Sequence, residues 1–61
     1  MTKKHFEAFA REIAAYVQYS EDTPENTRRY AIFAARIVVS VAQEFNPRFD
    51  RERFLKACGL S

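Results

Sequence analysis

Few side chains in this sequence have the type and spacing that catalysis or metal binding requires. Cys58 is the only cysteine and His5 the only histidine, and they lie at opposite ends of the chain. A nucleophilic cysteine needs a neighbouring base and a lowered pKa, and no residue near Cys58 supplies that base. No pair of acids is arranged for hydrolysis, and no glycine-rich loop is present to hold a phosphate. We therefore expect no catalytic residue, metal ligand or cofactor, and we do not class the protein as an enzyme.

Basic residues form two clusters that could contact phosphate. The first is Arg28 with Arg29, and the second comprises Arg48, Arg51, Arg53 and Lys56. One interpretation is a solvated helix surface, in which Glu25 pairs with Arg28 or Arg29. The other is a nucleic-acid interface, with a C-terminal helix entering a DNA groove. The net charge of only +2 makes DNA binding the alternative reading and not the first choice.

Phe33 is a candidate anchor for a protein interface. At about 100° per residue it projects beside Arg29, Arg36 and Ser40, within the polar stripe of a predicted helix. An aromatic ring surrounded by arginine is typical of binding hot spots. The alternatives are that a C-terminal helix or loop of the same chain covers the ring, or that it is a lone exposed phenylalanine with no role.

Two long helices are predicted to position these residues. The first spans residues 3–19, capped by Thr2, with Met1 and Phe6 at the spacing of a hydrophobic staple. Glu7 and Arg11 are spaced for an ion pair within this helix. The second spans residues 24–45. It begins with a Thr23 cap and a proline at its first position, and it must end near Asn46 because Pro47 disfavours helical conformation in the residue before it.

A short third helix is predicted after Asp50, which caps it. Phe49 and Phe54 have the spacing of a staple, and Gly59 is placed to end the helix. The fold class is therefore all-α: a single domain over residues 1–61, with two long antiparallel helices and a short C-terminal helix.

The second helix is more apolar than a small chain can cover alone. Its apolar residues fill an arc of roughly 220°, against about 100° for an ordinary surface helix; they are Tyr30, Ala31, Ile32, Ala34, Ala35, Ile37, Val38, Val39, Val41, Ala42 and Phe45. Within this arc Ala31, Ala35 and Ala42 form a strip that permits close approach of another helix. Either the first helix of the same chain packs there, or the strip is a seam between two copies.

A 61-residue domain buries a small core and usually needs extra support. One cysteine excludes an internal disulfide, so we expect a homo-oligomer, most simply a dimer; the alternative is unusually good helix packing within one chain. Arg36 interrupts the longest apolar run of the middle helix, which argues against a membrane span. The sequence shows no secretory signal, so the expected location is the cytoplasm.

The C-terminal run FNPRFDRERFLKACG (residues 45–59), behind an opening MTKK, resembles segments of small uncharacterised proteins found in phages and other mobile elements. That group has no assigned activity and adds no site residues. The resemblance implies either a compact inhibitor of a host protein, including an anti-defence protein, or a small transcriptional regulator. Our first choice is a non-enzymatic, homodimeric protein-binding module. The alternative is the DNA-binding regulator.

Overall fold

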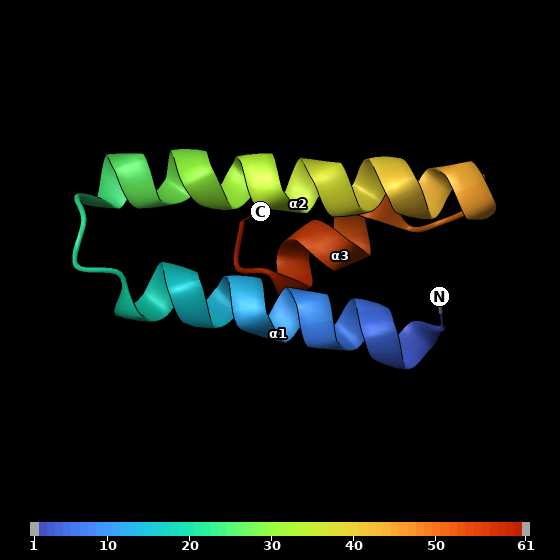
Figure 1. The fold of residues 1–61 in the computed structure, drawn as a ribbon, viewed down its shortest axis with the longest axis horizontal. Coiled ribbons are helices and arrows are strands. Elements are labelled where there is room, and N and C mark those ends of the chain that lie inside the picture. The colour runs from blue at the N-terminus through green and yellow to red at the C-terminus, as the bar shows by residue number, and fades with distance from the viewer. Residues whose placement is uncertain (1, 61) are drawn as a thin grey trace.

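The computed structural model describes residues 2–60, which form three helices (Figure 1). α1 (Lys3–Tyr19) and α2 (Pro24–Phe45) lie side by side and antiparallel, and the short α3 (Arg51–Ala57) packs against both of them. The predicted all-α fold is confirmed, including all three helix positions. The predicted staple involving Met1 lies outside the described residues.

α1 begins at a cap that involves the histidine. The backbone N–H of Thr2 donates to Nδ1 of His5 over 3.0 Å, so His5 occupies the position that Glu or Gln fills in a standard capping box. The predicted Glu7–Arg11 ion pair is wrong. The Arg11 guanidinium lies 3.8 Å from the carboxylate of Glu12 instead, and both side chains are so exposed that neither geometry contributes much to stability.

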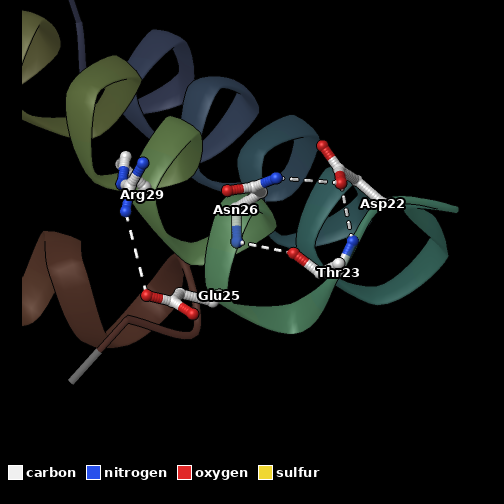
Figure 2. Close-up of polar contacts among 5 residues, drawn as sticks. All are labelled: Asp22, Thr23, Glu25, Asn26 and Arg29. Atoms are coloured by element: carbon white, nitrogen blue, oxygen red, sulfur yellow. Dashed lines mark hydrogen bonds and ion pairs between the residues drawn. The ribbon is translucent and has the colours of Figure 1, made fainter.

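The start of α2 follows the predicted signals (Figure 2). Oγ1 of Thr23 accepts the backbone N–H of Asn26 over 3.1 Å, and the Asp22 carboxylate accepts both the Thr23 N–H and the Asn26 side-chain amide. Glu25 lies 3.8 Å from Arg29, one turn along the helix. These local contacts satisfy backbone donors that a helix start leaves free.

α3 is also delimited as predicted. Asp50 accepts the backbone N–H of Arg53 over 3.0 Å, and the Phe49 and Phe54 rings form the staple with centroids 5.8 Å apart. Gly59 has φ = +79°, a conformation that glycine adopts without steric cost. The chain therefore turns after α3 and brings Leu60 back into the core.

The core is built mostly from small side chains of α2 and larger ones of α3 and the C-terminal tail. Its buried members are Ala10, Ile13, Ala31, Ala35, Val39, Ala42, Phe54, Cys58 and Leu60. Ala31, Ala35 and Ala42 are thus covered within one chain, with at most 1% of each exposed. The strip is therefore packed within one chain, as the first interpretation expected. It is not available as a seam between two copies.

The caps give a direct test of these boundaries. Thr23→Ala and Asp50→Ala should each lower the free energy of unfolding by about 0.5–2 kcal/mol, because each removes a side-chain acceptor for a helix N–H. Thr23→Ser and Asp50→Asn keep that acceptor and should recover most of the loss. Urea unfolding followed by circular dichroism measures all four. Equal stability of the alanine variants and the parent would contradict the cap assignments.

Candidate protein-binding surface

Seven large apolar side chains of α1 and α2 remain at least 40% exposed in the folded chain; Tyr19 and Phe45 are the last residues of their helices, and the other five lie within them. On α1 these are Phe9 (42%) and Tyr16 (40%), and on α2 they are Tyr30 (50%), Phe33 (55%) and Ile37 (66%). We call these five residues the apolar face. Scattered apolar side chains are ordinary on a protein surface, whereas a contiguous group of large ones indicates an interaction site.

Helix geometry places the α2 members of the apolar face on the side turned away from α3. The Arg28 side chain marks the opposite side, because it donates to the Leu60 carbonyl of the C-terminal tail over 3.3 Å. At about 100° per residue, Tyr30 and Ile37 project roughly 160° and 180° away from Arg28. They therefore point away from the tail and from α3.

The α1 members of the apolar face also point away from α3. Glu7 lines a cleft together with residues of α3, and Phe9 and Tyr16 project roughly 160° and 180° away from it. Because α1 and α2 lie side by side (Figure 1), their exposed rings share the surface of this helix pair that α3 does not cover.

Phe33 lies at the edge of the apolar face, because its neighbours on the helix surface are polar, as predicted. Its ring is 55% exposed, so neither α3 nor a loop of the described residues buries it. Arg29, Arg36 and Ser40 are all exposed beside it, and Arg29 is held by Glu25. The arrangement is an apolar centre with a charged rim, the usual anatomy of a protein interface.

Except for Arg29, the predicted basic residues lie near α3 and the C-terminal tail. Arg28 binds the Leu60 carbonyl, whereas Arg48 and Arg53 line the cleft next to α3. Arg51 and Lys56 are exposed on α3 itself. α3 has only seven residues and buries Phe54, so it is short for a recognition helix in a DNA groove, although Arg51, Arg53 and Lys56 are exposed on it.

Cys58 is fully buried within the core. Desolvation by burial raises the pKa of its thiol, which opposes formation of the nucleophilic thiolate. Cys58 is therefore a core residue of the described part of the chain. Between residues 2 and 60 no group of three or more metal-ligating side chains is assembled.

Sequence reasoning missed the α1 half of the apolar face. Their spacing puts Phe9 and Tyr16 on the apolar side of the first helix, but at its margin, and the structure leaves both partly exposed. Their angular offset from Ala10 and Ile13, the two α1 residues that are buried, is the sequence feature that could have indicated this exposure. Sequence alone did not establish how far round the helix its neighbours would reach.

Within residues 2–60 no helix has the length and apolarity needed to cross a membrane. No protein-family profile, no curated protein and no solved structure matches this chain.

Proposed function

We propose that this protein is a non-enzymatic binding module that pairs with a second copy of itself through the apolar face and acts by binding another protein. The observation that supports this most directly is the exposure of five large apolar side chains on one surface of the helix pair. Removal of apolar side chains from water is favourable. A partner that covers these five side chains would therefore gain binding free energy from their burial.

The surface area of the chain also supports a partner. The structure exposes 4849 Å², whereas a compact monomer of 7.1 kDa exposes about 4,100 Å². The difference, roughly 750 Å², approaches the ~800 Å² that each partner contributes to a standard stable interface. A second copy is the simplest occupant, because two identical apolar faces can cover each other about a twofold axis.

The composition of the face fits protein recognition better than phosphate binding. Tyrosine and arginine are enriched at the energetic centres of protein interfaces; here Phe33 lies beside Arg29 and Arg36, and Tyr30 belongs to the same apolar face. The resemblance of residues 45–59 to small proteins of mobile elements supports a role in the interaction of such an element with its host. We propose a compact inhibitor that acts by occupying a surface of a host protein, in the manner of an anti-defence protein.

Light scattering coupled to size exclusion tests self-association. At micromolar concentration the parent protein should have a mass near twice 7.1 kDa. Ile37→Lys should return the mass to that of one chain, because it places a charge at the most exposed position of the face. Its circular dichroism should stay helical, since Ile37 is not part of the monomer core.

Gln43→Lys is the matched control. It adds the same charge to the same helix, but Gln43 projects about 120° away from Ile37. It should leave the dimer intact. A parent protein that is monomeric throughout the micromolar range would contradict the self-pairing. Equal dissociation of both variants would move the interface away from the apolar face.

A further inference from the structure

A second surface feature lies on the other side of the helix pair, next to α3. There a cleft of ≈ 550 Å³ opens between the start of α1, the end of α2 and α3. This volume lies within the range of small-molecule sites in proteins, about 300–1,000 Å³. The apolar face does not contribute to it, since none of its five residues lines the cleft.

Four phenylalanines line the cleft, Phe6, Phe45, Phe49 and Phe54, and three of them form a row of packed rings. The ring centroids of Phe6 and Phe49 are 4.7 Å apart, and those of Phe49 and Phe54 are 5.8 Å apart. Phe54 is buried, whereas Phe6 and Phe49 are only half-buried. Ala42 and Ala57 also line the cleft, and their small side chains leave space over the rings.

The polar part of the cleft is basic. Lys3, Arg48 and Arg53 line it, against two acids, Glu7 and Asp50. The Asp50 carboxylate already accepts the backbone N–H that caps α3. Within the described residues the three cations make no ion pair, since those found join Arg11 to Glu12 and Arg29 to Glu25.

The start of α1 adds to this charge, whereas the end of α2, which also borders the cleft, carries the opposite partial charge. Lys3 is the first residue of α1, and the first turn of α1 contains no acid. Its free N–H groups therefore contribute a partial positive charge that no acidic side chain of that turn offsets. An anion near Lys3 would meet both the ammonium group and this helix end.

From these observations we infer that the cleft binds an amphipathic carboxylate, such as a fatty acid. The alkyl chain would lie over Phe6, Phe49 and Phe54, and Lys3, Arg48 and Arg53 would hold the anionic head. Contact with the rings removes the chain from water, and a charged head paired with guanidinium forms the stronger class of hydrogen bond. The inference does not depend on self-pairing, because the two surfaces share no residue.

The test is a titration of the ¹⁵N-labelled protein with dodecanoate below its critical micelle concentration, followed by NMR chemical shifts. Amides of residues 3–10 and 48–57 should shift together and saturate. Dodecanol, which lacks the charge, and acetate, which lacks the chain, should bind at least about tenfold more weakly.

Two variants and a control complete the experiment. Arg53→Gln should weaken dodecanoate binding by about tenfold, and Ala57→Leu should weaken it by filling the space over the rings. Arg51→Gln removes the same charge from α3 at a position that does not line the cleft, and it should bind as the parent does.

Four results would overturn the inference. These are no saturable shifts, equal binding of dodecanol, equal weakening by Arg51→Gln and Arg53→Gln, or shifts confined to Tyr30, Phe33 and Ile37. The last would show that the chain enters the apolar face instead of the cleft. Because the mass of the protein is measured separately, failure here leaves the proposed self-association standing, and the reverse also holds.

Discussion

Phe54→Ala should lower the free energy of unfolding by about 3–5 kcal/mol, the usual loss for truncating a buried phenylalanine. Phe54 is 5% exposed, and its ring packs against Phe49 at the point where α3 meets the helix pair. A domain of 61 residues is stabilised by only about 3–9 kcal/mol in total. We therefore expect this variant to be largely or wholly unfolded at 37 °C by circular dichroism.

Phe33→Ala is the matched control, since it removes the same atoms at a position that is 55% exposed. Measured at a concentration where the protein is monomeric, it should shift the unfolding midpoint only slightly. At higher concentration it should weaken self-association, because an interface anchor loses its contacts. A loss of several kcal/mol in the monomer would place Phe33 in the core and contradict its assignment to the apolar face.

Ala35→Leu should cost about 1–3 kcal/mol, because the side chain has no space to enter. Ala35 is 0% exposed, so extra methyl groups must push the surrounding core side chains apart or adopt strained rotamers. Urea unfolding of the monomer, followed by circular dichroism, measures this loss.

Ala34→Leu makes the same change one residue earlier, where the side chain is exposed. It should leave monomer stability nearly unchanged. If both substitutions were equally tolerated, Ala35 would not lie at a close approach of helices, and the strip it forms with Ala31 and Ala42 would again be a candidate seam between two copies.

The two proposed binding surfaces have different physical characters, which makes them separable. The apolar face is broad, rimmed by Arg29 and Arg36, and suited to another folded surface. The cleft is concave and combines a row of three packed aromatic rings with three cations, so it suits one small amphipathic anion. Salt should weaken binding of the anion more than it weakens pairing of the apolar faces, since charge contributes more to the first.

Local sequence was sufficient to determine the helices. The boundaries follow from residues within four positions of each end, such as Thr23 before Pro24 and Asp50 before α3, and the structure places them as predicted. Gly59 ends the last helix because the turn needs a positive φ. Caps, prolines and glycines act through neighbouring backbone groups, so their effects can be read without knowing the fold. His5 was missed at the start of α1 because an imidazole seldom takes the acceptor role in a capping box.

Tertiary structure decided which surfaces the helices bury. The apolar arc of α2 was evident from sequence, but only the placement of α1 and α3 shows that Ala31 and Ala35 are covered while Tyr30 and Ile37 are exposed. The bond from Arg28 to Leu60 joins residues 32 positions apart, and the cleft draws residues from all three helices. Such features depend on how helices cross and how far each reaches round its neighbour. Those geometries are set by packing between distant segments, and no local pattern encodes them.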